Sequence, residues 1–282
     1  MSILSKPSDI GSARANDMEF PQSQSAIPSD FVAILRQRGL IRGEWAQSPG
    51  SAGSFVETQA TTILAFKYGE GVLVAGDRRA TAGNIVMYDR ADKVIEIDRH
   101  SVMAIAGSPA AAWEMARILE HSFQFYRRSQ LQEMSVEGKV RALSKLLRDN
   151  LGMVIQGVGV VVPLFATYER QSSDPAKVFF YDAMGAQFEA ADFAASGSGG
   201  PAVRSVLYYE NGWGKKLLRE RSGDEAITIA LRALDTAAEA DTATGGVDHH
   251  GKIYPIIKVI TRDGISTIEH EKISSLYQSD LA

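Results

Sequence analysis

The sequence contains no cysteine, which excludes a disulfide framework and any metal site built on thiolates. It also lacks a long apolar run: the longest stretches, such as 158–166, fall short of the roughly 20 residues that a membrane span needs. Residues 1–20 include three acidic side chains and no apolar core, unlike a secretory signal. We therefore expect a cytoplasmic protein with no membrane association.

An excess of positive charge is missing as well. The formal net charge is −4 and the isoelectric point is near 5.8, so no basic field is present to attract phosphate backbones. We expect no nucleic-acid partner. At 282 residues, with 45% hydrophobic and 23% charged side chains, the chain has ordinary globular composition and room for one large domain with extra segments.

Residues 1–60 differ from the rest of the chain in composition and in hydrophobic pattern. Ser, Pro, Gln and Gly are frequent there, and the only helical pattern is a short one at 29–35. A segment so poor in periodic apolar residues buries too little surface to offset its ordering entropy. We expect it to be largely flexible.

The chain is organised around two apolar runs rich in β-branched residues, 61–68 and 72–81. A glycine-bearing turn joins them, which predicts a β-hairpin. The adjacent Thr61 and Thr62 begin the hairpin, Asp77 lies at its return end, and the next apolar segment supplies Lys93. A hairpin by itself is an ordinary core element. The order of these polar residues is what suggests a site.

Strand and helix patterns alternate in blocks along the rest of the chain. Further strands are expected at 84–89, 93–98, 102–106, 158–168, 178–182, 253–261 and 265–268. Helices are expected at 110–128, 136–156, 201–218 and 224–240. The first of these helices carries Trp113, Ile118, Phe123 and Phe125, which we expect to be core or subunit contacts. This order fits two stacked sheets, each covered by a helix pair, and we predict an α+β fold with four αββα layers.

The pattern of Thr61, Asp77 and Lys93 resembles the mature start of a proteasome β-subunit of the bacterial core-particle type, and the resemblance extends over about 61–264. It implies the αββα fold of N-terminal-nucleophile hydrolases and a threonine endopeptidase activity. It also implies that residues 1–60 are a propeptide, removed by cleavage between Ala60 and Thr61, and that 61–282 form the protease domain.

The implied chemistry depends on a free amine at Thr61. An α-amine has a pKa of roughly 7.7 to 8.0 and can accept the hydroxyl proton near neutral pH, which an amide nitrogen cannot do. By resemblance, Lys93 lowers the pKa of the threonine hydroxyl and Asp77 holds that lysine. Gly107, which follows a buried strand, would donate its N–H to the oxyanion.

Three further polar residues match the family's pattern around the threonine amine: Ser198, Asp241 and Thr244. By resemblance they orient the amine and the water that hydrolyses the ester. Turn and capping chemistry is the alternative for each of them. Many β-subunits carry serine where this chain has Thr244, so the hydroxyl is retained.

Substrate contacts are expected from small and apolar side chains near the hairpin. The candidates are Ala80, Thr81, Ala91, Ile95 and Ile105. Pairing a substrate as an added strand would hold it by main-chain bonds, and an apolar pocket predicts cleavage after hydrophobic residues. No cofactor or metal is expected, because the adjacent His249 and His250 point to opposite sides of an extended segment. We expect them in a solvated loop.

The resemblance also implies an assembly. The expected partners are proteasome α-subunits and other β-subunits in seven-membered rings stacked as αββα, a regulatory ATPase ring or other activator acting through the α-ring, and unfolded polypeptide substrates. Ala60 departs from the family, which usually has glycine there because self-cleavage needs a strained backbone. An unprocessed or inactive ring-forming β-subunit therefore stays an alternative, as does an amidohydrolase of the same fold with a small-molecule substrate.

Overall fold

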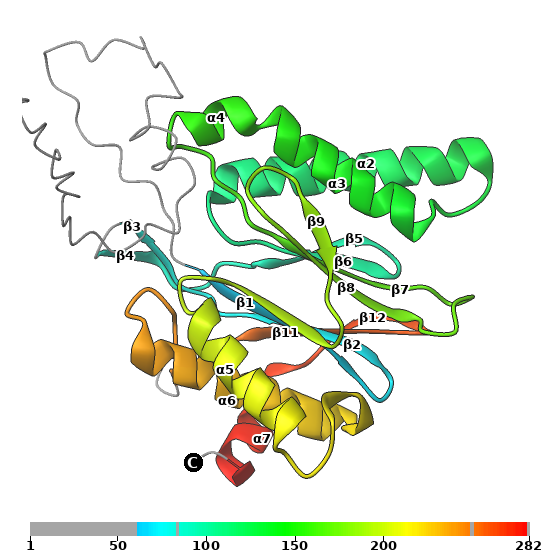
Figure 1. The fold of residues 1–282 in the computed structure, drawn as a ribbon. Helices are drawn as coiled ribbons and strands as arrows, with labels where there is room; N and C mark the ends of the chain where they lie inside the picture. The colour runs from blue at the N-terminus through cyan, green and yellow to red at the C-terminus, as the bar shows by residue number, and fades with distance from the viewer. Residues whose placement is uncertain (1–60, 83–84, 249–250, 281–282) are drawn as a thin grey trace, which may run out of the picture. The chain divides into compact units, whose positions relative to one another are not determined.

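The computed structural model describes residues 61–82, 85–248 and 251–280, which form two five-stranded sheets, a two-stranded sheet and several helices (Figure 1). The segment 1–60, with Ala60, lies outside the described residues, and so do His249 and His250. The expectations for a flexible propeptide and for the histidine pair therefore stay predictions.

All strand pairs of the described residues are antiparallel, both those joined by short turns and those brought together from distant parts of the chain. The first large sheet runs, in spatial order, through β10 (Phe193–Gly197), β1 (Thr62–Tyr68), β2 (Gly71–Gly76), β11 (Ile256–Thr261) and β12 (Gly264–Thr267). The second runs through β5 (Val94–Asp98), β6 (Ser101–Ala104), β7 (Leu164–Tyr168), β8 (Ala176–Tyr181) and β9 (Gln187–Glu189). The small sheet pairs β3 (Ala80–Ala82) with β4 (Ile85–Tyr88).

Each large sheet carries its own set of helices (Figure 1). The helices beside the second sheet are α2 (Pro109–Gln130), α3 (Val136–Asp149) and α4 (Leu151–Ile155). Those beside the first sheet are α5 (Gly200–Gly212), α6 (Gly223–Ala240) and α7 (His270–Asp280), with a 3-10 turn at Leu218–Glu220. In the part of the chain that the structure describes, no helix is long and apolar enough to span a membrane.

The side chains of β1 divide between two cores because successive residues of a strand face opposite sides of the sheet. Ile63 and Ala65 join an apolar cluster with residues of the second sheet, so this cluster lies between the two sheets. Leu64 and Phe66 join a different cluster, with residues of α5, α6 and α7. A sheet covered on both faces explains why every residue of β1 is buried.

The second sheet follows the same rule. In β6, Val102 and Ala104 face the cluster between the sheets, whereas Met103 packs with α2 and α3 in a third cluster. The expected mixture of α and β structure and the expected hairpin are both confirmed.

Four predicted elements are shorter than expected; one of them, the strand expected at 253–261, begins at Ile256. The helix expected at 136–156 is broken at Asn150. The side-chain amide of Asn150 donates to the Gly159 carbonyl at 2.6 Å. The strand expected at 158–168 begins only at Leu164, after Gly159 with a φ of +68° and after Pro163. The helix expected to reach 218 ends at Gly212.

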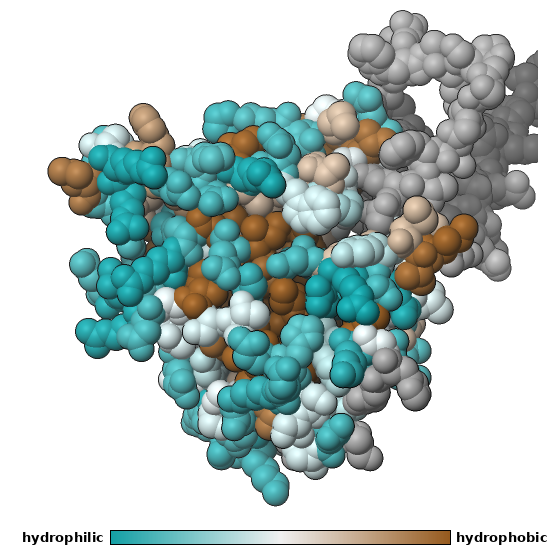
Figure 2. All heavy atoms as spheres, turned by 180° about the vertical axis from the view of Figure 1, so that it is seen from behind, coloured by the Kyte–Doolittle hydropathy of each residue, from teal (hydrophilic) through white to brown (hydrophobic). Residues whose placement is uncertain are grey.

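Three elements were not predicted: β9, β10 and α7. The sequence of β10, Phe-Ala-Ala-Ser-Gly, leads into a run of glycine and serine that resembles a turn, and its strand form comes from pairing with β1. Of the α2 aromatic residues, Phe123 is buried in the core, while Trp113 and Phe125 are exposed by 46% and 74%. Figure 2 shows one face of the molecule, on which hydrophobic residues are visible between hydrophilic ones.

The cluster between the sheets gives a first prediction. Leu164→Ala removes a side chain that is 1% exposed and leaves a cavity between closely packed sheets, so we expect the free energy of unfolding to fall by about 2–5 kcal/mol. Leu131→Ala, at a position 90% exposed, is the matched control and should change it by less than about 0.5 kcal/mol. Urea denaturation of both variants makes the measurement, and equal losses would contradict a core at Leu164.

Candidate active site

Strand β1 brings Thr61 and Thr62 between two neighbouring segments of the first sheet. On one side the register pairs Ile63 with Gly76, which places Asp77 next to Thr62. On the other side it pairs Thr62 with Gly197, which places Ser198 next to Thr61. The Ser198 N–H donates to the Thr61 carbonyl at 3.0 Å. Thr61 therefore directly precedes a strand that is held from both sides, and it is only 4% exposed.

The Asp77 carboxylate is fully buried and accepts four hydrogen bonds. Its Oδ1 accepts from the Thr62 N–H and from Lys93 Nζ, both at 2.7 Å. Its Oδ2 accepts from the N–H groups of Arg79 at 2.9 Å and Gly245 at 3.0 Å. This single side chain thus joins β1, the turn after β2, the residue before β5 and the loop after α6.

Lys93 is the buried cation of the site, 3% exposed. Besides the Asp77 carboxylate, its ammonium group donates to the Arg79 carbonyl at 2.5 Å. Burial lowers the pKa of Lys93 because it penalises the charged form, although the Asp77 carboxylate opposes this shift. The ammonium group and the Thr62 amide share one carboxylate oxygen, which places the cation beside the Thr61–Thr62 segment.

Gly197 is required by a close approach of two backbones. Its φ is +90°, and a Cβ there would lie 1.8 Å from the Thr61 carbonyl oxygen. Only glycine fits both conditions. Its bare backbone lets the loop that carries Ser198 reach Thr61.

Ser198, Asp241 and Thr244 form one group on the same side of β1. Thr244 donates its hydroxyl to Asp241 Oδ2 at 2.6 Å, and the Ala243 N–H donates to Oδ1 at 3.1 Å. Partial burial by itself would raise the pKa of the Asp241 carboxyl. Hydrogen bonds from Ser198, Thr244 and Ala243, together with the Lys93 charge, outweigh it and hold that pKa below its usual value.

Gly107 has the geometry of a backbone donor that its own sheet leaves unused. It forms an antiparallel bridge with Val161, and the flanking residues exchange the bonds: the Ser108 N–H donates to the Val160 carbonyl, and the Val162 N–H to the Ala106 carbonyl. In such a pair the Gly107 N–H faces away from its partner strand. Its φ of +106° and a Cβ position 2.0 Å from the Val160 oxygen both require glycine.

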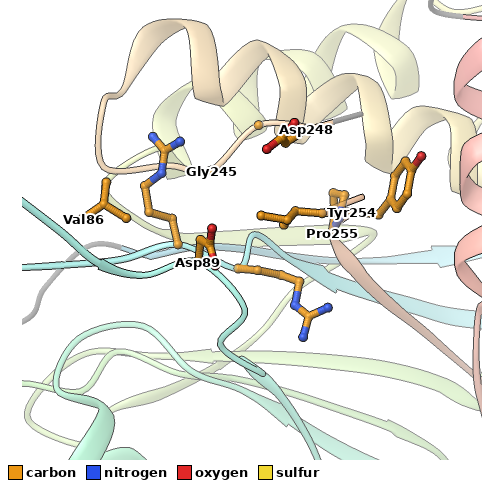
Figure 3. A pocket seen from close by; sticks show the side chains of 10 residues that line it. Val86, Asp89, Gly245, Asp248, Tyr254 and Pro255 are labelled. Carbon is orange, nitrogen blue, oxygen red and sulfur yellow. The ribbon is translucent and has the colours of Figure 1, made fainter. Parts of the chain in front are cut away.

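A small pocket of about 110 Å³ is lined in part by Arg79 and Gly245. The N–H groups of these two residues donate to Asp77 Oδ2, so the pocket lies near that carboxylate. Figure 3 shows Gly245 and Asp248 on the loop after α6, across from Val86 and Asp89. Thr61, Lys93 and Gly107 do not line it, so we do not take it for the reaction site.

The five predicted substrate contacts do not line this pocket either, and their role stays a prediction. Ala80 and Thr81 lie in β3, and the Ile105 N–H donates to the Lys93 carbonyl at 2.9 Å. Within the described residues no group of three or more histidine, cysteine or acidic side chains is arranged to hold a metal ion.

Sequence reasoning missed three contributors to this site. Arg79 holds Lys93 through its carbonyl and donates its guanidinium to the carbonyls of Thr242 at 3.0 Å and Thr244 at 3.1 Å. Gly245 supplies an N–H to Asp77, and Thr62 contributes both its amide and its hydroxyl. The adjacent threonines and the Asp-Arg-Arg run were visible signals, but the partners of these residues lie far away in the sequence.

Comparison with known proteins decides the family. A sequence model of the family described as "Proteasome subunit" matches residues 57–253. The chain belongs to the proteasome subunit family. Membership implies peptide hydrolysis and assembly with other proteasome subunits.

The similar proteins are β-subunits. A proteasome subunit beta 2 of Thermomonospora curvata is 39% identical over 220 residues, which cover 78% of this chain and 75% of the relative. A proteasome subunit beta of Streptosporangium roseum is 40% identical over 223 residues, covering 79% and 76%. One of Acidothermus cellulolyticus is 36% identical over 268 residues, covering 93% and 89%. The chain is thus a β-type subunit of a proteasome core particle.

The carboxylate at the centre of the site gives a second prediction. In Asp77→Asn the new side-chain NH2 group is itself a donor and faces N–H groups that also donate, so their hydrogen bonds are lost. Lys93 also loses its buried counter-ion. We expect the free energy of unfolding to fall by about 3–5 kcal/mol. Asp149→Asn breaks an ion pair with Lys145 that is exposed at both partners, so it should cost at most about 0.5 kcal/mol.

Denaturant titration of the two variants beside the parent chain measures the difference. If Asp77→Asn proved no more costly than Asp149→Asn, the carboxylate would not be the structural centre of the site.

Proposed function

We propose that this β-subunit is a threonine endopeptidase whose nucleophile is Thr61, and that it becomes active when residues 1–60 are removed as a propeptide. The observation that carries the proposal is the buried Lys93–Asp77 pair, which shares a carboxylate oxygen with the amide next to Thr61. Both side chains of this pair are under 5% exposed, so forming it costs the free energy of removing two charges from water. A role in stabilising charge that develops during a reaction is a physical reason to keep such a pair.

The proposed mechanism begins with cleavage of the Ala60–Thr61 bond, which converts an amide nitrogen into an α-amine able to accept a proton. The amine takes the Thr61 hydroxyl proton as Oγ1 attacks the substrate carbonyl. Lys93 stabilises the negative charge that develops on the hydroxyl oxygen, and its lowered pKa eases proton exchange there. The Gly107 N–H faces the oxyanion.

The reaction has two halves, acylation of Thr61 and hydrolysis of the resulting ester. The substrate C–N bond breaks, the departing amine takes the proton from the Thr61 amine, and the acyl group stays as an ester on Thr61. Water attacks that ester and gives a proton to the amine. The ester C–O bond then breaks, Thr61 Oγ1 takes that proton back from the amine, and the carboxylic product leaves. Ser198, Asp241 and Thr244 orient the amine and this water. Thr244 is hydrogen-bonded to Asp241, and the Ser198 hydroxyl to the Thr61 carbonyl.

We also infer that the layers form the αββα sandwich of N-terminal-nucleophile hydrolases. In support, one apolar cluster lies between the sheets and two others lie between a sheet and its helices. The proposed working form is a ring of seven β-subunits in a cytoplasmic particle stacked as αββα. An ATPase ring or other activator would feed unfolded polypeptides through the α-ring.

Self-processing is the third prediction. When the chain is co-expressed with its α-subunit, intact mass and N-terminal sequencing should find a species that begins at Thr61, because the hydroxyl attacks the Ala60 carbonyl. Thr61→Ala should keep the full chain. Ala60→Gly should process faster, since glycine reaches the strained backbone more easily.

Particles that assemble with the full parent chain would instead favour the alternative of an unprocessed, structural β-subunit.

Peptide preference is the fourth prediction. Processed particles should cleave fluorogenic peptides with a hydrophobic residue before the scissile bond at least about tenfold faster than those with an acidic residue, as an apolar pocket discriminates by roughly 1–3 kcal/mol. Thr61→Ala particles serve as the control. Turnover of small amides in place of peptides would indicate an amidohydrolase.

A further inference from the structure

The hydroxyl of Thr62 is a buried polar group that the proposed mechanism does not use. Thr62 is 0% exposed, and its Oγ1 lies 2.6 Å from the hydroxyl oxygen of Thr244. The Gly199 N–H donates to the same Oγ1 at 3.0 Å. Strand propensity would be met equally by valine, so the hydroxyl itself needs an explanation.

The direction of these bonds follows from the acid at the end of the chain. An ionised carboxylate only accepts, so Thr244 must give its single hydroxyl proton to Asp241 Oδ2, 2.6 Å away. Thr62 must therefore be the donor to Thr244. Each group thus donates to the next in one direction: the Gly199 N–H to Thr62, the Thr62 hydroxyl to Thr244, and the Thr244 hydroxyl to Asp241. We call this set the hydroxyl chain.

The hydroxyl chain is packed as well as bonded. A Cβ at Gly199 would lie 2.5 Å from Thr62 Oγ1 and 2.7 Å from Thr244 Oγ1, so only glycine leaves room for both oxygens. Thr244, like Thr62, is 0% exposed. Water has no access to replace a lost partner, and a missing hydroxyl would leave buried donors and acceptors unsatisfied.

The hydroxyl chain connects the two loops that flank Thr61. One is the loop 197–199, whose Ser198 N–H binds the Thr61 carbonyl, and the other is the loop 241–244. The Ser198 hydroxyl donates to the Thr61 carbonyl at 3.5 Å, and Ser198 also helps to lower the pKa of the Asp241 carboxyl. The side chain next to the nucleophile is thereby the bridge that sets where the Asp241 carboxylate lies relative to Ser198 and Thr61.

We propose that Thr62 is a positioning residue: its hydroxyl orders the Asp241 carboxylate through Thr244 for the amine of Thr61. This inference rests on the proposed function. It adds that the second threonine acts in catalysis, and that Thr62 and Thr244 work as one unit.

The test compares Thr62→Val and Thr62→Ser in particles assembled with the α-subunit and processed to Thr61. Valine keeps the shape and deletes the hydroxyl. We expect kcat for a hydrophobic fluorogenic peptide to fall roughly tenfold in Thr62→Val, the value of one lost hydrogen bond, with KM changed less than about twofold. Serine keeps the hydroxyl, so Thr62→Ser should retain kcat within about threefold.

Thr167→Val is the matched control. Thr167 is 1% exposed and its hydroxyl bonds to the Ser101 hydroxyl at 3.0 Å in the second sheet, remote from Thr61 in sequence and in sheet. It should lower thermal stability about as much as Thr62→Val while leaving kcat unchanged. Equal losses of kcat in the two valine variants would show that Thr62 acts only through stability and would overturn the proposal.

A double-mutant cycle tests whether the hydroxyls act as a unit. If they do, Thr62→Val combined with Thr244→Val should lose little more kcat than Thr244→Val alone. Multiplied losses would contradict a single chain.

The outcomes separate the two proposals. An inactive parent particle, or activity that survives Thr61→Ala, would overturn the proposed function. A parent dependent on Thr61 together with full kcat in Thr62→Val would overturn this inference alone. If Thr62→Val does not assemble, Thr62→Cys replaces it, since a thiol is a weaker donor and the chain has no other cysteine with which to pair. A full kcat in Thr62→Cys would likewise overturn the inference.

Discussion

The buried carboxylate of Asp77 is the constraint on which the rest of the site depends. A desolvated charge is stable only when its lone pairs are satisfied, and here a lysine and three backbone N–H groups satisfy them. These four donors come from four separate segments of the chain. Satisfying the carboxylate therefore requires that β1, the turn after β2, Lys93 and the loop after α6 all be in place together.

On the other side of β1 the structure uses hydroxyls that end at the Asp241 carboxylate, together with glycines that carry no side chain. Gly197 and Gly199 let their loop approach the backbone of Thr61 and the hydroxyl of Thr62, distances at which any side chain would collide. The two sides complement each other: the Asp77–Lys93 pair holds the strand electrostatically, and the hydroxyl chain holds it by directional bonds. Thr61, which directly precedes an inner strand, is thereby fixed more firmly than a residue on a loop.

Membership in the proteasome subunit family comes from comparison with other proteins, whereas the geometry of the site comes from the contacts within this chain. The family model begins at residue 57, just before Thr61, and the first sheet begins at Thr62. The relatives indicate what kind of subunit this is. The contacts of Thr61 and Thr62 indicate how this particular chain, with threonine at 244, arranges its polar groups.

Much of this protein was determined by local sequence. The hairpin at 61–76 follows from β-branched runs around a glycine turn, and α2 and α6 follow from apolar periodicity, because such signals need only neighbouring residues. Asp77, Lys93, Ser198, Asp241 and Thr244 were identifiable by their resemblance to a family. The strand form of β10, the break at Asn150 and the unused N–H of Gly107 were decided only by tertiary structure. So was the partnership of Thr62 with Thr244, 182 residues apart, because the identity of a buried polar group's partner depends on which distant segments the sheets and loops bring together.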